Sequence, residues 1–200
     1  KAGYRLIISD NHRNSPHEDP IGLFVSMRVE GMIYVTAPHD VDTSQHNVPT
    51  VLIGIKDHSG MKADEIFSDN FAGSVLLLEH LWAQGHREIA HLTGEGEIAQ
   101  MRRQAYEQFM TIRGVSPVVF GNNLSTDATG GYTGARQLLQ SRQAFTAVYA
   151  ANDAMATGAK TAFGEVGLHV PEDVSLVGYD NSSFASPSVS NLTTIDDRAA

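Results

Sequence analysis

The amino-acid sequence predicts an α/β fold built on parallel β-sheets. Short apolar runs alternate along the chain with longer segments of helical periodicity. Several of these runs are continuously apolar, as is typical of strands covered on both faces. Because strands that alternate with helices pair in parallel through right-handed crossovers, the pattern favours parallel sheets with helices packed against them.

The expected elements follow from this alternation. Strands are expected at 5–9, 31–35, 50–53, 66–68, 88–92, 145–150, 174–178 and 192–195. Helices are expected at 70–84, 99–113, 127–141 and 153–166. No internal repeat and no low-complexity linker interrupts this order.

Two of the expected helices have clear sequence signals. In the helix at 70–84, Asp69 or Asn70 can cap the amino end, and Gly85 can adopt the left-handed conformation that ends a helix. The helix at 153–166 carries a face of small residues around Gly158, which allows close packing against a sheet. Gly167 and Pro171 then end this helix.

Composition and charge exclude several classes of protein. The 14 basic and 23 acidic side chains give a net charge of −9, so this chain by itself is a poor partner for nucleic acid. The absence of cysteine excludes disulfide scaffolds, cysteine metal sites and cysteine nucleophiles. No apolar run has the length of about 18 residues that a membrane helix requires.

Signals for an enzyme, a cofactor or a metal ion are also missing from the sequence. The loop at 93–97 has two glycines but lacks the Lys-Ser/Thr pair of a phosphate-binding loop and the third glycine of a dinucleotide motif. No serine-hydrolase elbow and no His-Glu-x-x-His motif occurs. We therefore expect no cofactor, no metal ion and no catalytic residues.

Polar side chains follow the expected strands at the edge where parallel sheets bind ligands. They lie in the segments Asp69-Asn70, Met101-Arg102-Arg103, Asn152-Asp153 and Tyr179-Asp180-Asn181, and the candidate ligand residues among them are Asp69, Arg102, Asn152 and Asp180. Carboxylates accept hydrogen bonds from hydroxyls, and arginine and asparagine donate them, so the set suits a polyhydroxylated ligand. Taken singly, the asparagine and the aspartates could instead be helix caps or ordinary turn residues.

Three segments make the sequence resemble the LacI/GalR family of bacterial transcriptional regulators. They read Gly-His-Arg-Glu-Ile-Ala at 85–90, Ala-Asn-Asp-Ala-Met-Ala at 151–156 and Val-Pro-Glu-Asp-Val-Ser-Leu-Val-Gly-Tyr-Asp at 170–180. Further similar segments lie at 28–33, 48–53 and 192–195, in the order the family has them. The resemblance therefore extends over nearly the whole chain.

The resemblance implies the two-lobed fold of the family's effector domain, which is like that of type I periplasmic sugar-binding proteins. Residues 1–67 would form an incomplete amino-terminal lobe, and residues 68–191 the carboxyl-terminal lobe. Residues 192–200 would cross back to the first lobe. The chain would be truncated at both ends, and the DNA-binding helix-turn-helix would lie outside it.

The resemblance also implies roles for the four candidate site residues. Arg102 matches the family's effector-contacting arginine ahead of an aromatic residue, here Tyr106. Asn152 matches the sugar-contacting asparagine of the Ala-Asn-Asp motif, and Asp180 matches the aspartate of Gly-Tyr-Asp. Asp69 lies where the family's chain crosses between lobes, so it is a further effector-binding candidate.

These resemblances imply the effector-sensing domain of a sugar-responsive repressor. A small carbohydrate would bind between the lobes and change the affinity of a cytoplasmic homodimer, or a tetramer, for operator DNA. Two alternatives remain open at this point. One is a periplasmic solute-binding protein with the same lobes, and the other is an α/β enzyme acting on a sugar or nucleotide.

Overall fold

The computed structural model describes residues 5–8, 20–35, 47–54 and 63–197. The chain divides into two compact units, Lys1–Phe67 and Ser68–Ala200. Each unit contains a parallel sheet, which confirms the predicted α/β class. Within the described ranges, no helix has the length and apolar character that crossing a bilayer requires.

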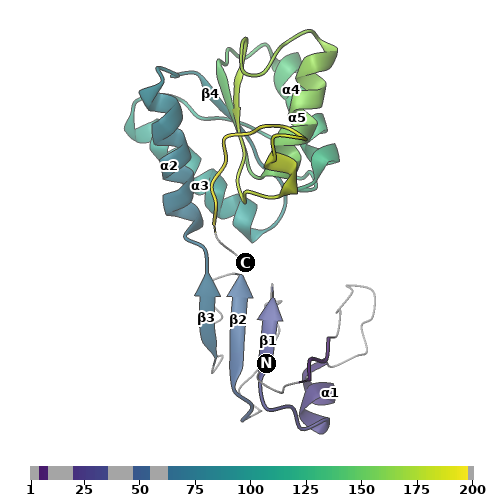
Figure 1. Ribbon diagram of the computed structural model, residues 1–200. Coiled ribbons are helices and arrows are strands. Elements are labelled where there is room, and N and C mark those ends of the chain that lie inside the picture. The colour runs from purple at the N-terminus through teal and green to yellow at the C-terminus, as the bar shows by residue number, and fades with distance from the viewer. Residues whose placement is uncertain (1–4, 9–19, 36–46, 55–62, 198–200) are drawn as a thin grey trace. The chain divides into compact units, whose positions relative to one another are not determined.

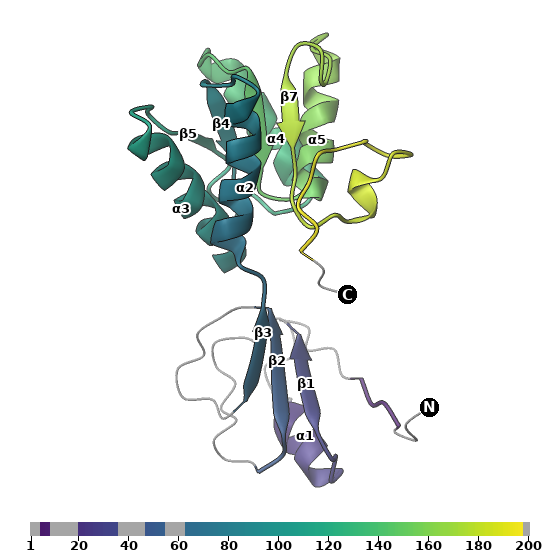
Figure 2. The ribbon, with the colours of Figure 1, turned by 60° about the vertical axis from the view of Figure 1, so that its left-hand side comes forward.

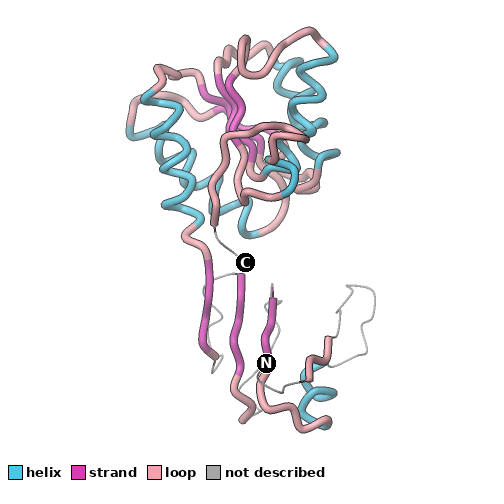
Figure 3. Tube along the Cα trace, viewed as in Figure 1, coloured by secondary structure: helices cyan, strands magenta, loops and turns pink. Residues whose placement is uncertain are grey.

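The first unit holds a three-stranded parallel sheet in the order β1-β2-β3, drawn in magenta in Figure 3. Its elements are α1 (Pro20–Ser26), β1 (Met32–Val35), β2 (Thr50–Gly54) and β3 (Asp64–Phe67). Met32 and Leu52 are buried on one face of this sheet, whereas Ile33 and Val35 on the other face are exposed. Helix α1 was not among the expected helices, and residues 5–8 form no strand.

The second unit is a four-stranded parallel sheet, in the order β5-β4-β6-β7, between two pairs of helices. The strands are β4 (Ile89–Leu92), β5 (Val118–Phe120), β6 (Ala147–Ala150) and β7 (Ser175–Val177). The helices are α2 (Asn70–Ala83), α3 (Glu97–Ile112), α4 (Ala128–Ser141), α5 (Asp153–Glu165) and the 3-10 turn η1 (Ser183–Ala185). Helices α2 and α3 cover one face of the sheet and α4 and α5 the other (Figures 1 and 2).

The alternation of side chains along the buried strands divides the core of this unit into two layers. In β4, Ile89 packs toward α2 and α3, whereas Ala90 and Leu92 pack toward α4 and α5. In β6, Tyr149 and Val148 divide between the two layers in the same way. Both strands are therefore covered on both faces, as their continuous apolar sequences predict.

Helices α4 and α5 approach each other closely through glycines. A Cβ atom on Gly131 would overlap the main chain at Met155, and one on Gly158 would overlap the carbonyl of Ala128. The small residue expected to allow contact with the sheet therefore makes its closest contact with a neighbouring helix. Larger side chains at these two glycines would force the helices apart.

Helix α2 has a side-chain cap at its amino end and an aromatic contact near its carboxyl end. Asp69 caps its amino end by accepting a hydrogen bond from the N–H of Ala72 at 2.9 Å. At the other end lies Trp82, the single tryptophan of the chain. The Trp82 ring contacts Phe109 edge-on at 5.9 Å and lies 4.0 Å from the guanidinium carbon of Arg87.

The four expected helices of this unit are confirmed to within two residues at each end. Strand β5 was not expected, because its three apolar residues lie between Pro117 and Gly121. It is the edge strand of the sheet, where a neighbouring proline is tolerated. The expected strand at 192–195 is reduced to one parallel bridge, from Thr193 to Val177.

Candidate functional site

A cluster of polar side chains surrounds Arg102 at the carboxyl ends of the strands in the second unit. Arg102 lies in the second turn of α3, which follows β4, and only 4% of its surface is exposed. Asp180 follows β7, and Ala151 follows β6. Because all the strands are parallel, these strand ends meet at one edge of the sheet.

Three hydrogen bonds and one aromatic ring hold the guanidinium of Arg102 in place. Its Nε donates to Asn70 Oδ1 at 2.9 Å, its Nη1 to the carbonyl of Ala151 at 2.6 Å and its Nη2 to Asp180 Oδ1 at 2.8 Å. The ring of Tyr179 lies against its face, 3.6 Å from ring centre to Cζ. A guanidinium has five N–H donors, so two have no partner among the described residues and are held in a fixed orientation.

Asp180 has both an unusual backbone and a shifted acidity. Its φ of 99° is in a region that residues other than glycine rarely adopt, and its N–H donates to the carbonyl of Ile195 at 3.0 Å. Burial raises the pKa of its carboxyl, Arg102 opposes this increase, and the charges of Asp153 and Asp197 add to it. Strained backbone in a charged cluster of this kind is typical of functional sites.

Behind Arg102, a chain of buried hydrogen bonds connects α2 to the sheet. Ser74 Oγ donates to the carbonyl of Asn70 at 2.7 Å and accepts from the Tyr149 hydroxyl at 2.8 Å. The Tyr149 carbonyl in turn accepts from His91 Nδ1 at 2.9 Å. The residues that hold Arg102 are therefore themselves fixed by the core.

His91 is fully buried, with its ring between those of Tyr106 and Tyr149 at centroid distances of 5.1 and 4.7 Å. A carbonyl only accepts hydrogen bonds, so Nδ1 carries the hydrogen of a neutral ring. Burial lowers the pKa of His91 to about 3, and the charges of Arg102 and Arg103 act in the same direction.

The four predicted site residues do not all have free side chains. Arg102 and Asp180 are brought into direct contact. Asn152 caps α5, because its Oδ1 accepts from the N–H of Met155 at 2.8 Å and its Nδ2 donates to the carbonyl of Thr126 at 2.8 Å. Asp69 is exposed and caps α2, so its carboxylate is beside the cluster in sequence but does not contact Arg102.

Asp153, beside Asn152, is a buried carboxylate that binds the segment after β7. One of its oxygens accepts from the N–H and hydroxyl of Ser182 at 2.8 and 3.1 Å, and the other from the hydroxyl of Thr194 at 2.7 Å. These bonds hold the loop that carries Asp180. Its part in the site is therefore to position that loop.

Sequence reasoning placed Asn70 and Tyr179 in polar segments that follow strands, but it did not predict that both contact Arg102. A signal for Asn70 was available, because the buried stripe of α2 runs through Ser74, Leu77 and Leu81 and begins at Asn70. Polar residues at the first positions of a buried stripe indicate a polar contact inside the protein. The only signal for Tyr179 was its position directly after the strand expected at 174–178.

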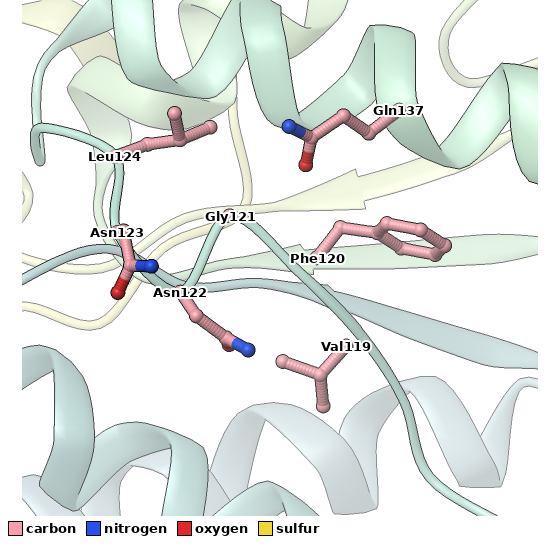
Figure 4. A pocket seen from close by; sticks show the side chains of 7 residues that line it. All are labelled: Val119, Phe120, Gly121, Asn122, Asn123, Leu124 and Gln137. Carbon is pink, nitrogen blue, oxygen red and sulfur yellow. The ribbon is translucent and has the colours of Figure 1, made fainter.

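A separate hollow of about 280 Å³ lies at the end of the edge strand β5. Figure 4 shows its lining side chains, which are those of Val119, Phe120, Asn122, Asn123, Leu124 and Gln137, around Gly121. The three amide side chains are exposed, and none of the lining residues belongs to the Arg102 cluster. We therefore place the candidate site at Arg102, where the polar groups are buried and prearranged.

Comparisons of sequence identify similar proteins over most of the chain. A sequence profile described as "Periplasmic binding protein-like domain" matches residues 78–200. The HTH-type transcriptional repressor PurR of Erwinia tasmaniensis is 30% identical over 205 residues, which cover 96% of this chain and 59% of the repressor. The repressor CytR of Escherichia coli is 29% identical with the same coverage. The chain thus spans about 59% of the length of these relatives.

Solved structures agree with these matches. A LacI-family transcriptional regulatory protein from Corynebacterium glutamicum has a TM-score of 0.79 and 34% identity, covering 98% of this chain and 72% of that protein. The lac repressor dimer bound to operator and the anti-inducer ONPF has a TM-score of 0.74 and 29% identity, covering 89% and 64%. The type I periplasmic-binding-protein-like fold implied by the sequence motifs is thereby confirmed.

Proposed function

Because this chain belongs to the LacI family of transcriptional regulators, we propose that it is the effector-sensing part of a sugar-responsive transcriptional repressor. The single observation that carries the proposal is the buried Arg102, held by Asn70, Ala151 and Asp180 with two donors left over. A prearranged donor of this kind binds a ligand with little loss of side-chain entropy.

In this proposal a small carbohydrate binds at the carboxyl edge of the second unit. Arg102 donates to ring or hydroxyl oxygens, Asp180 accepts from hydroxyls, and Asn152 and Asp69 contribute further polar contacts. No bond is made or broken, so the site has no catalytic residue. Residues 1–67 and 68–191 act as the two lobes, and residues 192–200 as the return crossover.

The ligand acts by stabilising one of two conformations. A bound ligand shifts such an equilibrium only by its difference in affinity for the two states, typically about 1–3 kcal/mol. Arg102 contacts Asn70, which follows the end of the first unit by three residues. A ligand bound to Arg102 is therefore one hydrogen bond away from the segment that connects the two units in sequence.

The rest of the proposal concerns the longer protein. By analogy with the repressors it resembles, it acts as a homodimer in the cytoplasm and binds operator DNA through a headpiece outside these residues. The net charge of −9 supports this division, since a chain of that sign depends on a separate basic domain to approach DNA.

The test measures sugar binding by calorimetry and operator binding by fluorescence anisotropy with the full-length protein. Arg102→Lys and Asp180→Asn are expected to weaken sugar binding by about tenfold to a hundredfold, as loss of a charged hydrogen bond does. Glu107→Gln, which removes a surface ion pair of the same helix, serves as the matched control. Unchanged sugar affinity in both site variants would refute the site, and operator binding unaffected by any bound sugar would refute the repressor.

A further inference from the structure

The charges around Arg102 favour one class of ligand over another. Arg102 lowers the pKa of Asp180, whereas the charges of Asp153 and Asp197 raise it. The pKa of Tyr179 is likewise lowered by Arg102 and raised by the charges of Asp197, Asp180 and Asp69. Among the described residues, the charges that shift the pKa values of Asp180 and Tyr179 are therefore mostly negative.

The positive charge of Arg102 is also already paired. Its Nη2 is 2.8 Å from the carboxylate of Asp180, and the side chain of Arg102 is 5% exposed. An anionic group of a ligand would have to displace Asp180 from this bond or approach it closely. Since like charges in a partly buried site repel strongly, either arrangement is unfavourable.

The amino ends of the helices at this edge carry acidic residues as well. Asp69 caps α2, Asp127 caps α4, and the first turns of α3 and α5 contain Glu97 and Asp153. The amino end of a helix attracts anions such as phosphate through its dipole and its free N–H groups. A carboxylate at each of these four ends cancels that attraction.

We propose that the Arg102 site selects a neutral or cationic polyhydroxylated ligand and excludes phosphorylated and carboxylated ones. This inference rests on the proposed effector function and adds the charge class of the effector. Asp180 is the residue that determines this specificity, because it occupies the position beside Arg102 that an anionic group would take. Asn70 and Tyr179 hold the guanidinium of Arg102 in the orientation in which it pairs with Asp180.

The first test uses inorganic phosphate as the probe and needs no knowledge of the effector. The thermal midpoint of the full-length protein is measured with increasing phosphate at constant ionic strength. We expect no saturable increase for the wild type, and an increase for Asp180→Asn, where the pairing carboxylate is removed. Asp173→Asn is the matched control, because Asp173 precedes β7 at the opposite edge of the sheet.

The second test compares matched sugars by calorimetry: ribose, glucose and galactose, their phosphate esters, and glucosamine. A sugar that binds is expected to lose about tenfold or more in affinity on phosphorylation. A phosphate ester that binds as tightly as its parent would overturn the charge selection and leave effector binding intact. If no sugar or ester binds, the proposed sugar effector fails.

The phosphate titration still decides the charge selection in that case. Saturable stabilisation of the wild type by phosphate would overturn it. An Asp180→Asn variant that gains no more stability from phosphate than Asp173→Asn would overturn the role given to Asp180.

Discussion

Asn70 Oδ1 accepts a hydrogen bond from Arg102 Nε at 2.9 Å, which joins the first residue of α2 to the second turn of α3. Both side chains are buried, so neither group can exchange the bond for water. Asn70→Ala is expected to lower the free energy of unfolding by about 1–3 kcal/mol, because it leaves a charged donor buried without its acceptor. Urea unfolding measures the change, and Gln104→Ala, at an exposed position of α3, is the control. Equal stability of the two variants would contradict the importance of the bond.

Gly73 provides the space for the Tyr179 ring that covers Arg102. A Cβ at this position would lie 2.8 Å from Tyr179 Cζ and would overlap the hydroxyl. Alanine favours a helix over glycine by about 1 kcal/mol, so a stability gain is the expectation from propensity alone. We expect Gly73→Ala instead to destabilise the protein by about 1–3 kcal/mol and to weaken effector binding, because Tyr179 must move.

The matched control for this substitution is Gly164→Ala in α5. Nothing lies within 4 Å of a Cβ placed there, so this variant is expected to gain up to about 1 kcal/mol. Thermal or urea unfolding of the two variants gives the comparison. A stabilised Gly73→Ala protein would show that Tyr179 is not confined by α2.

We expect the buried His91 to make the folded protein less stable in acid. Its pKa is lowered to about 3 in the folded protein, below the ordinary value of 6.5. Below pH 6.5 this histidine therefore binds a proton in the unfolded chain but not in the folded one. The stability that the neutral His91 contributes is present above pH 6.5 and is lost as the pH falls toward 3. The full effect has an upper bound of about 5 kcal/mol.

Urea unfolding between pH 7.5 and 4, the range that contains the ordinary histidine pKa, tests the role of this histidine. His91→Gln is expected to be less stable at neutral pH, since it loses the contacts with Tyr106 and Tyr149, and to show a shallower decline in acid. His80→Gln, on the exposed side of α2, should keep the decline of the wild type. Identical pH profiles for all three proteins would exclude His91 as the cause.

We expect the contribution of Asp180 to stability to have the opposite dependence on pH. Burial raises the pKa of its carboxyl despite the nearby Arg102, so the folded state holds its proton more tightly than the unfolded state. The contribution of this group to stability is thus largest below pH 3.8 and falls as the pH rises through the raised pKa. Asp180→Asn should become more stable relative to the wild type as the pH rises from 4, which parallel unfolding curves would detect. A constant difference between the two proteins over this range would contradict the shift.

The elements that were predicted correctly are those whose signal lies within their own sequence. The helix expected at 70–84 was predicted from a cap at Asp69 or Asn70 and an apolar face, and the one at 153–166 from a face of small residues that ends before Gly167. Asn152 caps the second helix in the structure and was predicted as a ligand residue. The same side chain can satisfy both patterns in a sequence, and only its hydrogen bonds show how it is used.

What the sequence could not supply depends on contacts between distant residues. Strand β5 has three apolar residues, too few for periodicity to register, and it is held by pairing with β4. The pairing of Arg102 with Asp180 spans 78 positions and was expected only from a common sheet edge. Tyr179 lies on Arg102 directly before the positive φ of Asp180. The sequence offers Asp180 as a turn residue, but a turn signal does not show which distant side chain the neighbouring tyrosine contacts.

The position of Trp82 determines which changes in the protein its fluorescence reports. It lies twelve positions after Asn70 in α2, which corresponds to about 18 Å along the helix axis. Its indole is in contact with Arg87 and Phe109, at the end of the helix remote from Arg102. The emission of Trp82 is therefore expected to report unfolding and to change little when the site is occupied, so a binding titration is better followed at Tyr179, whose ring lies on Arg102.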